Sequence, residues 1–405
     1  MQNIRAQFPI LKRKVNGKPL AYFDNAATTQ KPVSVIDALT RFYREANAPV
    51  HRSVYSLGVE ATERYEEVRT EVQKFINAKH AEEIIFTGGA TESLNIVASS
   101  FSEAFLKAGD TVLVGDSDHH AVIVPWQAVA EKKKLKLTFI PVADNGVIDL
   151  AAYKTLLKTK PKFVALTYIS NVLGVINPVK EMTALAHKAG AAVMIDAAQS
   201  VAHTPIDVQK LNCDFLAFSG HKMYGPTGVG VLYGKKELLE RMPPRTFGGN
   251  MIAEVTREKT TYAPLPAKFE AGTPPIAEVI GLGEAIRFIQ KIGFKAIQKT
   301  EGELTAYALK SFAKIPELSL LGSKNAQNRI PVFSFIMCGV HPHDIATLLD
   351  REGISVRAGH HCAEVLHRRF SITASVRASL TFYNTKAEID RLREALIRTV
   401  KKFNG

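Results

Sequence analysis

Residues 218–228 read FSGHKMYGPTG and place one lysine, Lys222, in a glycine-bounded loop between the apolar runs 215–218 and 229–233. An ordinary surface lysine lies among polar helical residues and stays protonated at pH 7. A lysine that forms a Schiff base needs a dry, fixed site that favours the neutral amine. The surroundings of Lys222 fit this second type and direct attention to pyridoxal phosphate, which also needs a carboxylate at its ring nitrogen and donors for its phosphate.

The candidate carboxylate is Asp196, which follows the apolar run 191–195. An acid at the carboxyl end of a buried parallel strand points into a ligand crevice, although an aspartate there can equally cap a helix. Lys222 follows 222 − 196 = 26 residues later, after one further apolar run, and this spacing favours the cofactor interpretation. An ionised Asp196 would keep the pyridine nitrogen protonated. Gln199 would then reach the ring hydroxyl.

The candidate phosphate site is the sequence TGGATE at residues 87–92, where two glycines precede helix-forming residues. Backbone N–H groups at such a helix start bind phosphate well. A Gly-Gly pair alone is more often only a turn. Ser219 and His221, on either side of Gly220, strengthen the interpretation because they offer a hydroxyl and an imidazole to the same anion.

Apolar runs alternate with helical patterns, which is typical of a doubly wound α/β domain with a mainly parallel sheet. Candidate site residues come just after such runs, where strand ends form a ligand crevice. The expected strands are 111–114, 137–140, 163–168, 192–195, 215–218 and 229–233, and the residues that follow such runs are Thr91, His119, Asn171, Asp196 and Ser219. Residues 181–189 are expected to form a helix that ends at Gly190.

Beyond residues 243–275 the pattern changes to that of an α+β domain. Helical stretches are expected over 276–312, 343–352 and 388–403, and strands over 332–337 and 376–381. We predict three parts: residues 1–25 as an N-terminal segment that packs with the small domain, residues 26–270 as a large cofactor-binding domain, and residues 271–405 as a small C-terminal domain.

Composition limits the classes of function. The chain has 405 residues, 46% of them hydrophobic, and no apolar run approaches the roughly 20 residues of a membrane span. The first residues lack the apolar core of a secretion signal, and three cysteines fit a reducing cytoplasm. The net charge of +13 is spread over lysines among helical residues without a nucleic-acid-binding motif, so we expect no nucleic-acid partner.

The chain resembles the type II cysteine desulfurases of the SufS/CsdA group in the aminotransferase class V family, over essentially its whole length. The resemblance implies a fold type I pyridoxal-phosphate enzyme with an active site at a homodimer interface. The motifs that carry it are DNAATTQKP at 24–32, HH at 119–120, SNVLG at 170–174, DAAQ at 196–199, the lysine loop, FEAGTP at 269–274, RAGHHCA at 357–363 and RASL at 377–380.

The resemblance assigns roles to the cofactor-binding residues. Lys222 would form the Schiff base, Asp196 would meet the pyridine nitrogen and Gln199 the ring oxygen, while His119 would stack on the ring and assist proton transfer. The phosphate would be held by Thr91, Ser219 and His221, with Thr273 contributed by the second subunit. Asn171 and Arg377 would hold the substrate carboxylate, and a guanidinium fork suits a carboxylate better than a lysine does. His51 and Arg357 would line the entrance.

Cys362 distinguishes this pattern from that of an aminotransferase, because a desulfurase needs a thiol that receives sulfur. The resemblance implies that L-cysteine becomes L-alanine, with a persulfide on Cys362 that supplies iron–sulfur cluster assembly through an acceptor of the SufE/SufU type. His360, His361 and Arg357 would favour the thiolate if they are cationic or donate hydrogen bonds. A zinc site is disfavoured because neither Cys213 nor Cys338 belongs to a ligand pair, and no metal is expected.

Several alternatives stay open. Selenocysteine or cysteine sulfinate would fit the same site, whereas a β-lyase or an aminotransferase would leave Cys362 without a task. A non-catalytic sulfur-transfer scaffold would be expected to lack Lys222, Asp196 or Cys362, and all three are present. The chain also departs from the family. After Ala363 relatives usually have a polar residue, a proline and an apolar pair, whereas this chain continues with EVLHRR at 364–369, and Pro275 follows Thr273-Pro274. These departures leave the partner surface and the mobility of the cysteine loop open.

Overall fold

A seven-stranded sheet forms the centre of the protein, whose computed structural model describes residues 2–404. The strand order is β4-β10-β9-β8-β7-β5-β6, and β10 alone runs antiparallel to its neighbours β4 and β9. The strands are β4 (Ile84–Thr87), β5 (Thr111–Gly115), β6 (Lys136–Ile140), β7 (Phe163–Thr167), β8 (Ala192–Asp196), β9 (Phe215–Ser219) and β10 (Gly230–Gly234). The predicted doubly wound α/β sheet is therefore confirmed, with strand ends within two residues of those expected.

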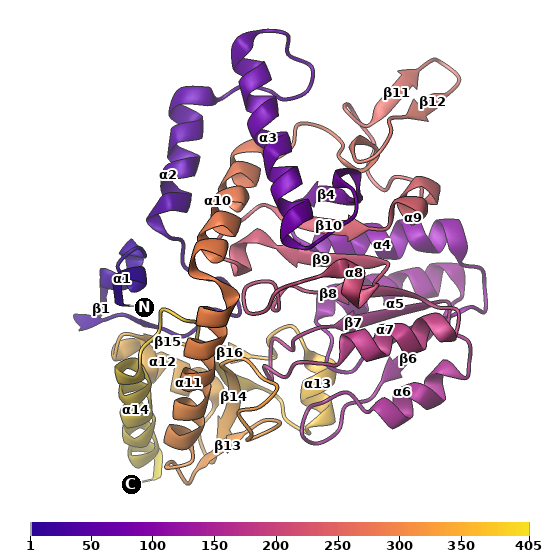
Figure 1. The fold of residues 1–405 in the computed structure, drawn as a ribbon. Coiled ribbons are helices and arrows are strands. Elements are labelled where there is room, and N and C mark those ends of the chain that lie inside the picture. Colours follow the sequence, from indigo (N-terminus) through magenta and orange to yellow (C-terminus); the bar gives the residue numbers. More distant parts are fainter. Residues whose placement is uncertain (1, 405) are drawn as a thin grey trace.

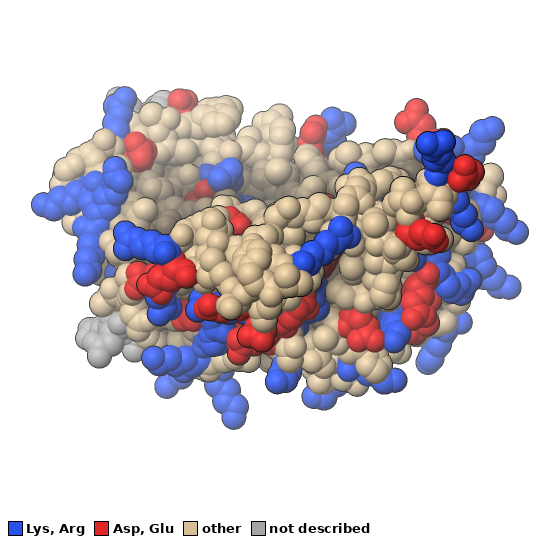
Figure 2. Space-filling model, turned by 90° about the horizontal axis from the view of Figure 1, so that it is seen from above, with Lys and Arg blue, Asp and Glu red and all other residues tan. Residues whose placement is uncertain are grey.

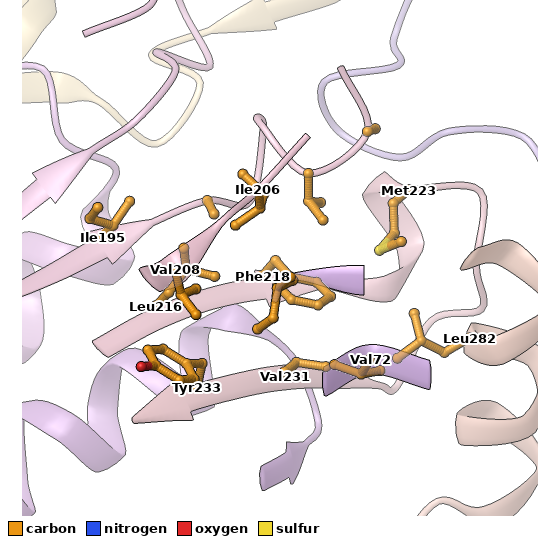
Figure 3. Packing of buried hydrophobic residues seen from close by; sticks show 14 of the residues in the cluster. Val72, Ile195, Ile206, Val208, Leu216, Phe218, Met223, Val231, Tyr233 and Leu282 are labelled. Atoms are coloured by element: carbon orange, nitrogen blue, oxygen red, sulfur yellow. The ribbon is translucent and has the colours of Figure 1, made fainter. Parts of the chain in front are cut away.

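Helices cover both faces of this sheet (Figure 1). Side chains of β9 alternate between two cores, because successive residues of a strand point to opposite faces. Phe215 and Ala217 join the core under α4 and α5, and Leu216 and Phe218 join the core on the other face, where Figure 3 shows them near Val231. The helices of this part are α4 (Ala90–Phe105), α5 (His120–Lys133), α6 (Leu150–Leu157), α7 (Val179–Lys188), α8 (Val208–Leu211) and α9 (Lys236–Arg241).

The helix predicted over 181–189 is confirmed as α7, which begins two residues earlier. Gly190 follows its C-cap with a φ of 83°, a left-handed conformation that costs glycine little and most residues more. Gly190 therefore ends the helix for the reason that the sequence indicated.

A second sheet of four strands, in the order β13-β14-β17-β16, forms the C-terminal part and is antiparallel throughout. Its core includes Phe333, Phe335 and Val376, and it lies under the helices α11, α12 and α14. The elements are α10 (Ile276–Ile292), α11 (Phe294–Phe312), β13 (Leu318–Leu320), β14 (Val332–Met337), α12 (Pro342–Arg351), β15 (Ile354–Ser355), β16 (Arg357–Gly359), α13 (Glu364–Arg369), β17 (Ser375–Ser379) and α14 (Lys386–Asn404).

The N-terminal residues cross to the C-terminal part. Strand β3 (Ala21–Tyr22) pairs in parallel with β15, and Ala21 and Phe23 lie in the core of the four-stranded sheet. Helix α10 instead packs against α2 (Val33–Arg41) and α3 (Ser56–Phe75). The division into 1–25, 26–270 and 271–405 stays a prediction. The remaining short elements are α1 (Gln2–Arg5), β1 (Lys14–Val15), β2 (Lys18–Pro19) and the hairpin β11 (Ile252–Val255) and β12 (Thr260–Tyr262), which projects from the body in Figure 1.

The surface carries its excess of basic residues without one continuous patch on the face shown in Figure 2. Lys and Arg lie mainly along the edges of this face, with Asp and Glu among them. Within residues 2–404, no helix has an apolar stretch long enough to cross a bilayer. The expectation of no nucleic-acid partner stays a prediction.

Candidate active site

A cavity of about 320 Å³ lies where the ends of the central strands meet the C-terminal part. Eleven of the thirteen predicted site residues line this cavity. They are Thr91, His119, Asn171, Asp196, Gln199, Ser219, His221, Lys222, Arg357, Cys362 and Arg377. Residues nearly 300 positions apart in the chain therefore share one pocket, and their roles stay proposals.

Lys222 is the last residue of a short 3₁₀ turn, Gly220–Lys222, which follows β9 directly. Its side chain lines the cavity. Burial lowers the pKa of Lys222, and nearby Arg377 lowers it further, against the attraction of Asp196. Asp196 ends β8 and accepts a hydrogen bond from the Ala198 N–H through Oδ1 at 2.9 Å. Burial raises the pKa of Asp196, and Lys222 opposes this. The pair provides a buried amine and a buried carboxylate in one cavity.

The start of α4 provides the candidate phosphate site. Ser219 Oγ accepts a hydrogen bond from the Ala90 N–H at 2.8 Å, which holds the helix start against the lysine turn. A Cβ at Gly230 would lie 2.4 Å from the Gly89 Cα, so the loop before α4 requires glycine in the neighbouring strand. Thr91 and His221 line the same end of the cavity. Burial lowers the pKa of His221 to about 4, so this imidazole is neutral at pH 7.

His119 is fixed as a neutral imidazole. It is the N-cap of α5, and its Nδ1 accepts a hydrogen bond from the Ala121 N–H at 3.0 Å. Burial, followed by the charge of Lys222, lowers the pKa of His119 to about 3. A neutral imidazole that accepts at Nδ1 carries its proton on Nε2. His119 therefore offers a donor, not a charge, to whatever occupies the cavity.

Arg377 on β17 is buried and donates two hydrogen bonds. Its Nη1 donates to the Asn171 carbonyl at 3.2 Å, and its Nη2 donates to Asp24 Oδ1 at 3.1 Å. The buried Nε of Arg377 has no hydrogen-bond partner within the described residues. Arg357 donates to both carboxylate oxygens of Asp24, at distances of 2.8–3.1 Å. Arg377 lines the cavity, and these contacts hold its guanidinium group there.

Cys362 is exposed and lies in a loop with an uncommon backbone. His361 and Cys362 have φ values of 53° and 57°, in the left-handed region. The Cys362 carbonyl accepts a hydrogen bond from the His120 N–H at 2.7 Å, and His120 Nε2 accepts one from the Glu364 N–H at 3.0 Å. The start of α5 therefore holds the cysteine loop from both sides.

His361 was expected to favour the Cys362 thiolate if it is cationic or donates a hydrogen bond, and the first of these conditions is not met. Burial, followed by the nearby charge of Arg377, lowers the pKa of His361 to about 2, so the imidazole is neutral at pH 7. His361 therefore cannot favour a thiolate through its own positive charge.

Two predicted site residues lie elsewhere. His51 and Thr273 line a separate pocket of about 260 Å³ together with Gly272 and Pro274. Within one chain the structure does not bring His51 to the entrance near Cys362. Thr273 is the residue that was expected to serve a second subunit. It does not line the cavity of its own chain, and its role stays a prediction.

The sequence alone assigned no role to Asp24, although this residue begins the motif at 24–32. Its carboxylate contacts Arg357 and Arg377, which are 333 and 353 residues away in the chain. Gln199 is oriented in a similar long-range manner, since its amide donates to the Ala26 carbonyl at 2.7 Å. A pattern in one segment cannot reveal such contacts, and only the motif 24–27 as a whole signalled that this segment belongs to the site.

The cavity fits pyridoxal phosphate by the chemistry of its donors. Lys222 would bind the aldehyde carbon, Asp196 the ring nitrogen and Gln199 the ring oxygen, while His119 offers a ring face. Phosphate donors are supplied by Thr91, Ser219 and His221 beside the start of α4. Among the described residues, no group of three or more His, Cys, Asp or Glu side chains is arranged to hold a metal ion.

Comparison with known proteins agrees with this interpretation. Residues 21–392 match the family Aminotransferase class-V, and the chain belongs to this family of pyridoxal-phosphate-dependent enzymes. The chain is 48% identical over 400 residues to the probable cysteine desulfurase of Halalkalibacterium halodurans, covering 99% of this chain and 98% of that one. It is 48% identical to the cysteine desulfurase of Synechococcus elongatus over 98% of this chain, but spans only 63% of that longer protein.

A solved structure has the same fold. The apo structure of the cysteine desulfurase from Thermococcus onnurineus NA1 superposes with a TM-score of 0.94 at 39% sequence identity, covering 99% of this chain and 98% of that one. The predicted resemblance to the cysteine desulfurases, the fold class and the cofactor are therefore confirmed.

Proposed function

We propose that this protein converts L-cysteine to L-alanine and collects the sulfur as a persulfide on Cys362. The observation that carries the proposal is the presence of an exposed thiol in the same cavity as a buried lysine with a lowered pKa and a buried arginine. An aminotransferase needs the lysine and the arginine but has no use for the thiol. The names of the relatives support the same activity.

The position of each residue in the cavity suggests its role. Arg377 would bind the substrate carboxylate with its guanidinium group, which lines the cavity together with Asn171. The Asn171 side chain donates to the His361 carbonyl at 2.7 Å and so ties the carboxylate site to the cysteine loop. Lys222, whose pKa is lowered by burial, would take the proton from the substrate α-carbon. Pyridoxal phosphate, when bound, supplies the electron sink for the carbanion at that carbon.

Cys362 would attack the sulfur of the substrate side chain as a thiolate. Arg357, which lines the cavity, would stabilise the negative charge of the thiolate. The ion pair with Asp24 neutralises part of the positive charge of Arg357. The same geometry holds for selenium or a sulfinate group in place of the thiol, so selenocysteine and cysteine sulfinate remain alternative substrates.

We also propose a homodimer. His51 and Thr273 line the separate pocket with Arg52 and Gly249. Val54 and Phe247, each two residues from one of the latter two, are 97% and 66% exposed. Large exposed apolar side chains that gather in one region often mark an interface. A second subunit there would bring Thr273 to the phosphate of its neighbour. Light scattering on the wild type and on a Val54→Asp variant tests this, since the variant should be lighter.

The wider role follows from the persulfide. A reactive thiol requires a reducing compartment, which favours the cytoplasm, and the sulfur needs an acceptor protein of the SufE/SufU type on its way to iron–sulfur clusters. These assignments come from the family resemblance and await tests with candidate acceptors.

The experiment that tests the desulfurase activity compares three proteins. Alanine formation from L-cysteine with a thiol reductant is measured for the wild type, for Cys362→Ala and for Cys338→Ala, with visible absorbance to show that each binds the cofactor. Cys338 is the matched control because it is also a free, exposed cysteine. Loss of alanine only in Cys362→Ala supports the proposal. Undiminished turnover by that variant would make the thiol incidental and favour a β-lyase.

A further inference from the structure

The loop at residues 170–174, SNVLG, divides its hydrogen bonds between itself and the C-terminal part. Inside the loop, the Val172 and Leu173 N–H groups donate to Ser170 Oγ at 3.3 and 3.1 Å, and the Gly174 N–H donates to the Ser170 carbonyl at 2.9 Å. The loop therefore satisfies these three donors by itself. The carbonyl oxygens of residues 171–174 have their partners outside the loop.

The C-terminal part supplies one donor to each of these four carbonyl oxygens. Asn171 accepts from Arg377 Nη1 at 3.2 Å, Val172 from Ser334 Oγ at 2.7 Å, Leu173 from Arg329 Nη2 at 3.2 Å and Gly174 from the Ile330 N–H at 2.9 Å. Buried backbone groups need such partners, and a complete set fixes the backbone in one geometry. The loop is thus held against the C-terminal part from residue 171 to residue 174.

Gly174 shows how closely the two parts meet. Its φ is 68°, and a Cβ there would lie 2.8 Å from the Ile330 carbonyl oxygen and 2.9 Å from that of Val332. A side chain at this position would force the backbone of one part to shift, so only glycine allows the contact. The loop and the start of β14 are therefore in direct backbone contact.

Arg329 is the charged donor of this set that does not line the cavity. It is 8% exposed, and the hydrogen-bond partners of its guanidinium group are the carbonyl oxygens of Leu173, Val332 and Ser323. Burial lowers the pKa of Arg329 to about 10, so the group still carries its charge at pH 7. A buried charge needs compensating hydrogen bonds, and a planar guanidinium group donates them in fixed directions. Arg329 therefore holds the loop at a fixed position relative to β14.

The same loop reaches the cavity through Asn171. Its carbonyl accepts from Arg377 Nη1, and its side-chain amide donates to the His361 carbonyl at 2.7 Å, next to Cys362 in the chain. Asn171 and Arg377 both line the cavity. A shift of the loop would therefore displace Asn171 and break the hydrogen bond that orients Nη1 of Arg377.

We propose that Arg329 is a positioning residue for the substrate carboxylate. It holds the loop 170–174 against β14, and the loop in turn orients the guanidinium group of Arg377 through the Asn171 carbonyl. Arg329 acts only through these residues, since it is not part of the cavity lining. The proposal rests on the proposed role of Arg377 and extends the carboxylate site to a residue for which the sequence indicated no role.

The test compares two amines that differ only in the carboxylate. L-alanine and ethylamine are titrated against the holoenzyme, and binding is followed by the visible absorbance of the bound cofactor. In Arg329→Met we expect the dissociation constant of L-alanine to rise by at least about tenfold, as when a hydrogen bond to a charged group is disturbed, and that of ethylamine to change by less than about twofold. Arg329→Lys keeps the charge without the planar fork and should lie between the wild type and Arg329→Met.

Two further variants serve as controls. Arg391 also donates to backbone carbonyl oxygens, those of Pro19 and Glu352, but it lines a different pocket. Arg391→Met should therefore bind both amines as the wild type does. Arg377→Lys is the reference for the carboxylate site and should weaken the binding of L-alanine alone.

Two results would overturn the proposal: unchanged binding of L-alanine by Arg329→Met, or equal weakening of both amines, which would mean general damage to the cofactor site. If Arg329→Met does not retain the cofactor absorbance, Ser334→Ala decides the question. That variant removes only the donor of the Val172 carbonyl and should still weaken L-alanine more than ethylamine.

The design separates this proposal from those on which it depends. If Arg377→Lys does not weaken L-alanine selectively, the role of Arg377 is wrong and the role of Arg329 falls with it. If Arg377→Lys does so and Arg329→Met does not, only the role of Arg329 is wrong. Because neither amine contains sulfur, the result is independent of the desulfurase activity.

Discussion

Replacement of the buried Glu270 by glutamine should destabilise the protein more than replacement of an exposed charged residue. Glu270 Oε1 and Oε2 accept hydrogen bonds from Arg69 Nη1 and Nη2 at 2.8 and 3.0 Å, and Oε1 also accepts one from the Phe86 N–H at 2.7 Å. Both charged side chains are only 3% exposed. Removing one partner of a buried pair costs about 3–5 kcal/mol. Glu66 also accepts hydrogen bonds from Arg69, but it is 40% exposed and compensates only part of the arginine charge.

This free energy converts to a measurable shift in melting temperature. The entropy of unfolding is about 2.1 cal/mol/K per residue, which for 405 residues gives about 0.85 kcal/mol/K. A loss of 3–5 kcal/mol therefore lowers the melting temperature by about 4–6 °C, followed by differential scanning calorimetry of the holoenzyme. Glutamine keeps the size of the side chain and the acceptor for Phe86, so the shift reports the charge.

The control lies on α3, the helix that carries Arg69. Glu60 and Arg64 form an exposed i,i+4 pair on α3, and Glu60→Gln should shift the melting temperature by less than about 1 °C. In the double variant Arg69→Met with Glu270→Gln, no buried charge remains, because Glu66 is 40% exposed and keeps its contact with His51, and most of the loss should be recovered. A shift below 1 °C for Glu270→Gln, or simple additivity in the double variant, would refute the reasoning.

Further predictions concern the cavity. Lys222→Ala should abolish the covalent link to the cofactor, so that borohydride reduction leaves the protein mass unchanged. Arg377→Lys should raise KM for L-cysteine by at least about tenfold because an ammonium cannot replace the guanidinium fork, and an unchanged KM would contradict the role of Arg377. The lowered pKa of His119, about 3, means that the unfolded chain binds more protons below about pH 6.5, so stability falls as the pH drops. His119→Asn, which can still cap α5, should lose about 1–2 kcal/mol less than the wild type between pH 7 and pH 5, and equal losses would contradict this origin.

Local features of the sequence predicted much of the fold. The strands around Lys222 and Asp196 were predictable because each is a short apolar run bounded by glycine or polar residues, and each run adds one buried strand to a parallel sheet. The end of α7 was predictable because Gly190 carries its own backbone preference. In these cases the information lies within a few residues of the feature.

Other features depend on contacts between distant segments. Asp24 contacts two arginines of the C-terminal part, and Ser375 connects His361 with His367, to which the sequence assigned no role. The neutral state of His361 follows from burial beside Arg377, which no local pattern reveals. His51 was placed at the cavity by resemblance, but within one chain it belongs to another pocket. Tertiary packing, not local preference, decides such positions.

The pairing of β3 with β15 sets an order of events during synthesis. Ala21 and Ile354 are partners in this ladder and are 354 − 21 = 333 residues apart. At about 5–20 residues per second, a ribosome needs about 17–67 s to add those residues. Phe23, which ends in the core of the C-terminal sheet, has no permanent place to pack during that interval. The nascent chain must therefore carry an exposed apolar segment near its start until translation is nearly complete, which makes this segment a natural binding site for chaperones.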